Sequence, residues 1–194
     1  MRTNLIRLLS LALVGCSGTT NPEPRVDEPP ARPLLLVVNK SSGTLSALDP
    51  QTGEEVAVAT TGFAPHEVAV TADGALAVVT DYGTGALPGK TLTVIELAGF
   101  RVARTIDLTP HTMPHGIAPL ADGTVWVTTE GSRHVLRVDP QAGAIVTAVE
   151  TSQQATHQVA VSEARDRVIT ANIGSGNATV VDGSSGAVVA HVAT

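Results

Sequence analysis

The chain has 194 residues, a formal net charge of −6 at pH 7 and only 2% aromatic residues. This acidic balance, without a basic stripe or interleaved aromatic residues, excludes nucleic acid as a partner because the surface would repel phosphate. Abundant Val, Ala, Thr and Gly in place of Leu, Lys and Glu favour strands over helices.

Residues 1–16 resemble a bacterial lipoprotein signal peptide. Arg2 and Arg7 precede an apolar stretch, residues 8–14, that is too short to span a bilayer as a helix. The stretch ends in Leu13-Val14-Gly15-Cys16, which is similar to a lipobox, where the cysteine is acylated and becomes the mature N-terminus. We therefore expect lipidation at Cys16. The alternative is an ordinary signal peptide or an inert thiol.

Residues 17–33 are rich in proline and poor in apolar side chains. Such a segment cannot bury enough surface to offset chain entropy, so we expect a tether that holds a domain away from a lipid surface. The lipoprotein resemblance implies an extracytoplasmic, membrane-anchored protein. Ser17 follows the cysteine, where aspartate would favour inner-membrane retention. This predicts the periplasmic face of the outer membrane if the source is Gram-negative.

From residue 34 onward, two short phrases recur at intervals of about 42 to 49 residues. The phrase Pro-His-Glu-Val-Ala-Val at 65–70 returns in related form at 114–118 and at 156–161. A second phrase, Asp-Pro-Gln-Thr-Gly at 49–53, returns at 139–143 and 182–186. A period of this length is typical of β-propeller repeats. The predicted fold class is therefore all-β, a propeller of four-stranded antiparallel blades.

Alternating apolar runs between turn residues predict the strands of each repeat. A partial blade at 34–64 is expected to hold strands at 34–39, 44–48 and 54–59. The first full blade, 65–113, is expected to hold strands at 67–70, 76–80, 91–97 and 102–108. The next blade, 114–155, is expected to hold strands at 116–119, 124–129, 134–138 and 144–150. The last blade, 156–194, is expected to hold strands at 158–161, 167–172, 178–181 and 187–192.

These strands make about three and three-quarter blades, near the lower limit for a closed propeller. We expect the chain to be a truncated fragment of a longer protein and part of a larger, seven-bladed propeller. The alternative is a short chain that closes by self-association or as a small ring, because an open array leaves edges unpaired.

The segment from Tyr82 to Lys90 makes the first full blade, 65–113, longer than the next blade, 114–155. It contains glycine and proline and is expected to be an elongated loop between two strands. Exposed connections of this kind often hold binding residues. Tyr82 and Lys90 therefore mark a candidate binding loop.

Over residues 34–194 the repeats resemble the YVTN family of β-propellers. The resemblance depends on the Pro-His-x-Val-Ala-Val phrase, the Asp73-Gly74 turn, the strand at 78–82 and the strand at 91–97. It implies a seven-bladed ring with an extracytoplasmic location. Functions in the family range from surface-layer and adhesion roles to binding and some enzymes, so the fold does not select among them.

One repeat is similar to a blade of the streptogramin lyase family. Pro114–Ile117 is followed by Val125–Glu130 and by His134–Pro140. That family's propeller uses acid–base groups and a divalent metal. The other repeats lack the tryptophan, and no Glu-x-His pairing carries the family's catalytic residues over, so we predict no catalytic residues. A metal-dependent lyase or lactonase is the alternative function.

His66, His115 and His157 hold equivalent positions in successive repeats. If the first strand of each blade lines the central channel, these imidazoles could converge near one rim and hold Zn or Cu. The alternative is a structural role in which each ring bonds to the backbone of a neighbouring blade. His111 could add a ligand, although a surface position is the simpler expectation. Apart from this divalent metal, we expect no cofactor.

Four aspartates, Asp73, Asp122, Asp139 and Asp182, lie in turns, where their side chains are expected to accept hydrogen bonds from nearby amides. No dense Asp/Asn loop for calcium and no distinguishable Ser-His-Asp arrangement is present. The sequence therefore predicts a lipid-anchored cell-envelope propeller that acts as a binding module for a protein or a small molecule.

Overall fold

The computed structural model describes residues 33–194, which form fifteen β-strands and one short 3-10 helix. The predicted signal peptide, Cys16 and nearly all of the tether lie outside the described residues. Within residues 33–194, no helix has the length and apolar character needed to cross a membrane.

The strands form one three-stranded and three four-stranded antiparallel sheets, each in simple up-and-down order. The first sheet contains β1 (Leu35–Asn39), β2 (Thr44–Leu48) and β3 (Glu55–Thr60). The second contains β4 (Val68–Val70), β5 (Leu76–Gly83), β6 (Pro88–Glu96) and β7 (Arg101–Asp107). The third contains β8 (Pro114–Pro119), β9 (Val125–Thr129), β10 (His134–Asp139) and β11 (Ala144–Glu150). The fourth contains β12 (Thr156–Ser162), β13 (Arg167–Asn172), β14 (Asn177–Asp182) and β15 (Val188–Ala193).

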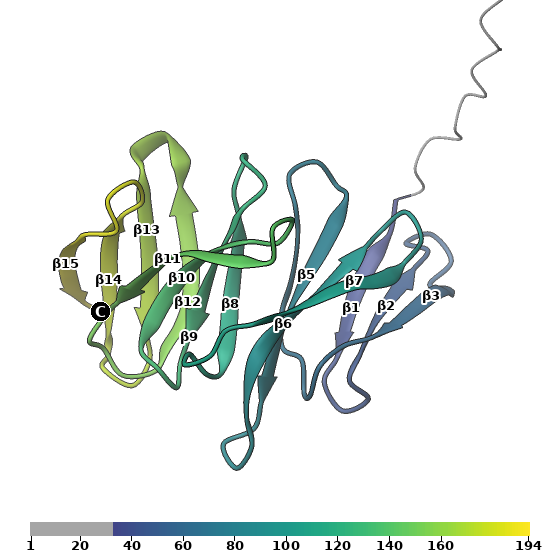
Figure 1. The fold of residues 1–194 in the computed structure, drawn as a ribbon, viewed down its shortest axis with the longest axis horizontal. Helices are drawn as coiled ribbons and strands as arrows, with labels where there is room; N and C mark the ends of the chain where they lie inside the picture. The colour runs from purple at the N-terminus through teal and green to yellow at the C-terminus, as the bar shows by residue number, and fades with distance from the viewer. Residues whose placement is uncertain (1–32) are drawn as a thin grey trace, which may run out of the picture. The chain divides into compact units, whose positions relative to one another are not determined.

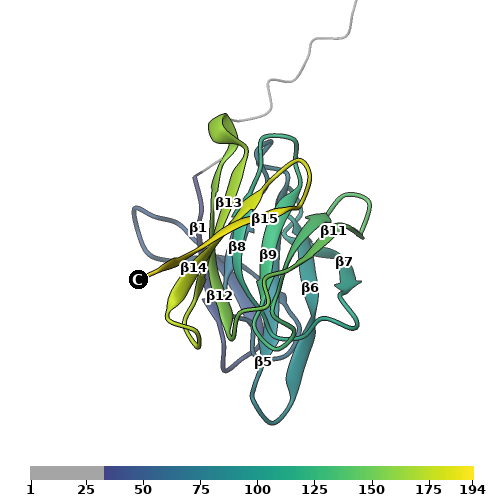
Figure 2. The ribbon, with the colours of Figure 1, turned by 90° about the vertical axis from the view of Figure 1, so that its left-hand side faces the viewer.

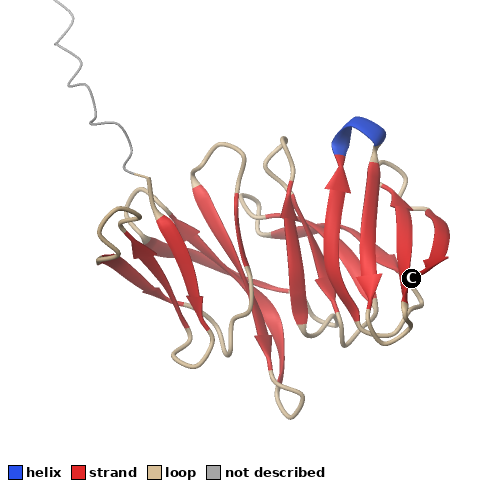
Figure 3. Cartoon of the chain, turned by 180° about the vertical axis from the view of Figure 1, so that it is seen from behind, coloured by secondary structure: helices blue, strands red, loops and turns tan. Residues whose placement is uncertain are grey.

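The four sheets stand side by side in chain order, as blades of a β-propeller (Figure 1). Figure 2 looks onto the last sheet, with β15 at its outer side. The helix η1 (Glu163–Arg165) caps the turn between β12 and β13 at one end of that sheet (Figure 3). The predicted all-β propeller with one incomplete and three complete blades is confirmed.

The apolar core is divided into three clusters, one between each pair of neighbouring sheets. Leu45 of the first sheet packs with Val79 and Ile95 of the second. The other two clusters join the second sheet to the third, and the third sheet to the fourth through Trp126, which is 1% exposed. Alternating side chains of each inner sheet thus fill the space on both of its faces, as propeller packing requires.

The turn aspartates have the predicted role. Asp73 accepts a hydrogen bond from the amide of Ala75, and Asp122 accepts one from the amide of Thr124. Asp139 and Asp182 do the same for amides two or three residues further on. The hydrogen bonds from threonine hydroxyls and amides lower the pKa of Asp73 and Asp122, because they favour the ionised carboxylate.

The predicted loop between Tyr82 and Lys90 is largely strand instead. β5 continues to Gly83 and β6 begins at Pro88, so the hairpin extends beyond the blade with Gly83 paired to Pro88. Only residues 84–87 form the tip. The glycines permit this tight pairing, since a β-carbon at Gly89 would lie 1.8 Å from the carbonyl oxygen of Asp81.

A polar residue at or near the end of each blade's second strand ties that strand to the third strand. Asn39 donates to the hydroxyls of Thr44 and Ser46, and Asn172 donates to Asn177 and Thr179. Asp81 accepts from Thr91 and Thr93 in the same way. Thr129 holds this position in the third blade. These contacts fix the direction of the residue that follows, which lies at the rim of the blade.

Candidate functional site

The three histidines of the repeated phrase stack at one rim of the fold. His66 precedes β4, while His115 lies on β8 and His157 on β12. The ring centroids of His66 and His115 are 4.0 Å apart, and those of His115 and His157 are 3.8 Å apart. The structure therefore brings together the three side chains that repeat spacing singled out.

Neighbouring inner strands approach each other closely at this point. The hydroxyl of Thr128 on β9 donates to the carbonyl oxygen of His157 on β12, at 2.5 Å. The pairing of β12 with β13 shifts its register between Thr156 and Gln158, on either side of this residue. The backbone of one blade is thus held against its neighbour, which sets the ring-to-ring spacing.

Two glutamates complete the cluster. Glu130 directly follows β9, and its carboxylate accepts a hydrogen bond from the hydroxyl of Tyr82 at 2.6 Å while also contacting Nδ1 of His157. Oε1 of Glu67 lies 3.5 Å from Nδ1 of His115 and accepts a hydrogen bond from the side-chain amide (Nε2) of Gln158. Each glutamate therefore joins residues from different blades.

These side chains form two overlapping groups with metal-ligand spacing. His66, Glu67 and His115 make one group, and His115, Glu130 and His157 make the other; within each, one ligand atom per residue lies within 4.8 Å of the others. Imidazole nitrogens with one carboxylate oxygen suit Zn²⁺ and related transition metals. The shared residue, His115, is the centre of the cluster.

Burial keeps the central histidine neutral. It lowers the pKa of His115 to about 4, with further lowering by the neighbouring His66 and His157. The pKa of His66 is also lowered, first by burial and then by the positive charge of Lys40. A neutral imidazole has a free lone pair, which is the form that binds a metal.

The glutamate at the other end of the cluster stays ionised. Burial raises the pKa of Glu130, but hydrogen bonds from His157 and Tyr82 more than offset this effect and the net pKa is lowered. Burial and the hydrogen bond to Glu130 raise the pKa of Tyr82 to about 12. The site thus presents a carboxylate and a neutral phenol side by side.

A purely structural role would place each histidine ring against the backbone of a neighbouring blade. Among residues 33–194, none of the three rings makes such a bond: His157 pairs with Glu130, and Nδ1 of His115 is buried without a hydrogen-bond partner. The 3.5 Å contact of that nitrogen with Glu67 is within ion-pair range but lacks hydrogen-bond geometry. An imidazole nitrogen left in this state is unusual in a folded protein.

Other predicted site residues lie apart from the cluster. His111 is half-buried rather than a surface residue, and its ring lies 4.5 Å from that of His134. Lys90 lies on β6, and its backbone oxygen accepts a hydrogen bond from Leu108. Of the predicted binding loop, only Tyr82 contacts the histidines, at 5.2 Å from His66 between ring centroids.

Sequence reasoning missed Glu67, Glu130 and Lys40. A detectable signal existed for Lys40 and Glu130, because the residue after the polar position near the end of each second strand is equivalent from blade to blade. These residues are Lys40, Tyr82, Glu130 and Ile173. Aligning the four repeats at this position would have marked a rim position next to each histidine.

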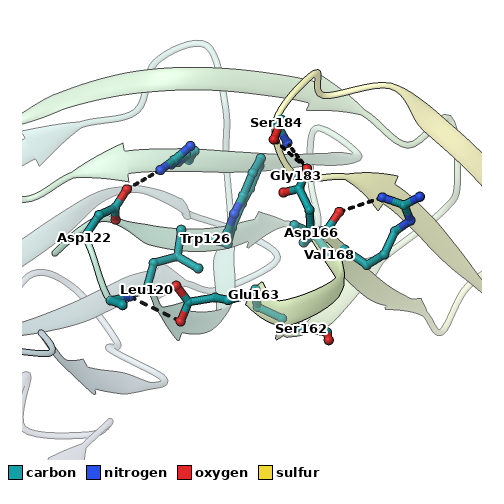
Figure 4. Close-up of a pocket in the computed structure, with 13 residues that line it drawn as sticks. Leu120, Asp122, Trp126, Ser162, Glu163, Asp166, Val168, Gly183 and Ser184 are labelled. Carbon is teal, nitrogen blue, oxygen red and sulfur yellow. Dashed lines mark hydrogen bonds and ion pairs between the residues drawn. The ribbon is translucent and has the colours of Figure 1, made fainter.

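A pocket of about 300 Å³ lies between the third and fourth sheets (Figure 4). Trp126 forms part of its wall, and the charged groups around it already have hydrogen-bond or ion-pair partners. Arg137 pairs with Asp122, and Asp166 accepts hydrogen bonds from Ser184. Because its polar groups already have partners, this pocket is a weaker candidate site than the histidine cluster.

No protein-family profile and no curated protein sequence matches the chain. Its fold is similar to a chain of hydrazine synthase from Kuenenia stuttgartiensis, with a TM-score of 0.72 and 23% identity over 83% of this chain and 46% of that one. It is also similar to a functionally unknown protein from Desulfotomaculum acetoxidans, with a TM-score of 0.67 and 15% identity over 82% of this chain and 52% of that one. The chain spans about half the length of these two structures, and the likeness shows the fold alone.

Proposed function

We propose that this protein is a binding module whose stacked histidines hold a divalent transition-metal ion. One observation carries the proposal: Nδ1 of His115 is buried without a hydrogen-bond partner, in a side chain that is only 3% exposed. A buried nitrogen without a partner costs free energy, on the order of 1–3 kcal/mol. A metal ion held with Glu67 would supply the missing partner.

The chemistry of the donor set supports a transition metal over calcium or magnesium. Three imidazoles and two carboxylates surround the site, whereas Ca²⁺ and Mg²⁺ prefer sets made of oxygen atoms. The imidazoles of His66 and His115 are neutral near pH 7 because burial lowers the pKa of each. No proton must therefore be displaced from these two ligands when the ion binds.

Metal binding is tested on the full chain by calorimetric titration with Zn²⁺ and by metal analysis after gel filtration. We expect about one ion per chain and at least a tenfold loss of affinity in His115→Ala and Glu67→Gln, since both change ligands of the group formed by His66, Glu67 and His115. His191→Ala is the matched control, because His191 is an exposed residue of β15. Equal Zn²⁺ affinity in wild type and His115→Ala would refute the proposal.

The setting we propose for this module is a lipid-anchored protein of the cell envelope, on the periplasmic face of an outer membrane. The support is the lipobox-like sequence before Cys16 and the resemblance of the repeats to the YVTN family. Cys16→Ser should move the protein from the membrane fraction to the soluble fraction of the expressing bacterium. Continued membrane association of Cys16→Ser would contradict lipidation at this residue.

A second candidate function is a metal-dependent lyase or lactonase. The observation that favours it is the contact of Glu130 with both Tyr82 and His157 beside the metal-ligand group, since such groups can move protons at a bound substrate. The zinc-loaded chain would then open lactones or eliminate from esters, and His115→Ala would abolish turnover. Zinc binding without turnover on such substrates would leave the binding module as the function.

A further inference from the structure

A single positive charge lies at the edge of the histidine cluster. Lys40 occupies the turn between β1 and β2, and its Nζ lies 5.0 Å from the centroid of the Tyr82 ring. That ring is in turn 5.2 Å from the His66 ring and 5.3 Å from the His115 ring. The positive charge of Lys40 also helps to lower the pKa of His66, so the ammonium group lies near the end of the cluster that His66 forms.

This ammonium has no acidic partner within residues 33–194. Its one described contact is with the face of Tyr82, whose hydroxyl is held by Glu130. The side chain is exposed, so its charge faces the solvent in front of the cluster. A cation that is positioned by an aromatic ring but lacks an anion is well suited to attract one.

The net charge of the neighbouring metal-ligand group also favours binding of an anion. With neutral histidines, Glu67 contributes the one negative charge of the group formed by His66, Glu67 and His115. A divalent ion held there would keep an excess positive charge, and Lys40 would add to it. Three protein ligands also leave a fourth position of a tetrahedral ion open.

We propose that Lys40 makes this open position an anion subsite, so that the metal-loaded protein takes a small ligand bearing a carboxylate or phosphate group. This inference rests on the proposed metal-binding function. One oxygen of the ligand occupies the free position on the metal, and Lys40 neutralises the remaining charge. The ring of Tyr82, which contacts both Lys40 and the histidines, positions the ammonium group and limits the size of the ligand.

The test uses the full chain loaded with Co²⁺, whose visible absorption reports changes in its ligands. Acetate and inorganic phosphate are titrated separately, and acetamide serves as an uncharged analogue of acetate. We expect acetate or phosphate to shift the cobalt bands and acetamide to have little effect. Whichever anion binds more tightly identifies which of the two groups the natural ligand carries.

The decisive variant is Lys40→Met, which keeps the length of the side chain and removes its charge. We expect it to bind Co²⁺ as wild type does and to bind the anion about three- to fivefold more weakly, the size typical of an exposed ion pair. Lys40→Arg should restore the anion affinity. Lys90→Met is the matched control, because Lys90 is the other lysine of the chain and lies outside the cluster.

Three results would overturn the anion subsite. Equal anion affinities in wild type and Lys40→Met would do so, as would an acetamide response equal to that of acetate. Cobalt binding without any response to either anion would also remove the subsite, yet leave the proposed metal-binding function intact. Failure to bind cobalt, in contrast, would refute the proposed function and this inference together.

Discussion

Gly116 lies against the backbone at His157, so closely that a β-carbon at position 116 would be 2.8 Å from the carbonyl oxygen of His157. The amide of Gly116 also donates to the hydroxyl of Thr128, which itself donates to that same carbonyl oxygen. β8 and β12 can thus approach only because residue 116 has no side chain. The stacking of His115 on His157 depends on this approach.

Gly116→Ala should destabilise the protein by about 1–3 kcal/mol, because the inserted methyl group must push two backbones apart. It should also weaken Zn²⁺ binding, since the rings would separate. Urea unfolding followed by circular dichroism measures the first effect. Gly85→Ala is the control, because a β-carbon there would meet no atom within 4 Å. Unchanged stability in Gly116→Ala would show that the strands can shift without cost.

The ionisation of Tyr82 can be observed directly, because the chain contains one tyrosine. Its pKa of about 12 results first from burial and then from the hydrogen bond to Glu130 and that residue's negative charge. Glu130→Gln removes the charge, so we expect the pKa to fall toward the ordinary value near 10 while the burial effect remains. Ultraviolet titration at 295 nm measures this change. An unchanged titration curve in Glu130→Gln would mean that the two residues do not interact in solution.

The stability of the metal-free protein should depend on pH through His115. Its folded-state pKa of about 4 lies below the ordinary 6.5, so the unfolded state binds more protons between these values. Stability is therefore complete above about pH 6.5 and decreases as the pH falls toward 4. His115→Gln should flatten part of this dependence, while His66, whose pKa is also lowered, should retain the rest.

Urea unfolding at pH 7.5, 5.5 and 4.5 measures this difference between wild type and His115→Gln. The loss in wild type should be on the order of 2 kcal/mol over this range. Parallel pH profiles for the two proteins would contradict a buried neutral His115. His191→Gln serves as the control for a histidine outside the cluster.

Asp81→Asn should leave the stability at pH 7 unchanged or slightly higher. Burial raises the pKa of Asp81, and the hydrogen bonds from Thr91 and Thr93 offset this only in part. A group with a raised pKa stabilises the fold at pH values below its unfolded pKa, and this contribution is lost as the pH rises through the folded pKa. Asparagine avoids the loss, and Asn39 and Asn172 already hold the equivalent position.

Thermal unfolding of Asp81→Asn at pH 4 and pH 7 checks this expectation. The variant should lose less stability than wild type as the pH rises. Thr93→Val provides the contrast, because it removes a hydroxyl partner of the buried carboxylate. A strong destabilisation of Asp81→Asn at pH 7 would show that the ionised carboxylate is required.

The sequence predicted the strands well because each blade repeats the same alternation and the same turns. Asp73-Gly74 and its equivalents mark hairpins by local chemistry alone, so the elements around them were located within a few residues. The prediction of a long loop after Tyr82 was wrong for a physical reason. The glycines and proline of this segment resemble a loop, but Gly83 and Gly89 instead permit a close strand pairing that the sequence pattern does not reveal.

The candidate site was predicted only in part. Repeat spacing located His66, His115 and His157, because equivalent positions in successive blades share one rim. Glu130 was not found, since its contacts with Tyr82 and His157 join residues 48 and 27 positions away in the sequence. Aligning the repeats would have marked its position at the rim, but its partners depend on how neighbouring blades pack.

The division of the core into separate clusters has a consequence for how the molecule opens. Each cluster joins one pair of adjacent sheets, so within residues 33–194 the second and third sheets have apolar partners on both faces while the first and fourth have one each. Amide hydrogens of β5 and β9 should therefore exchange with solvent more slowly than those of β2 and β14. Unfolding would then begin at the outer blades, with His115 in the part that persists longest.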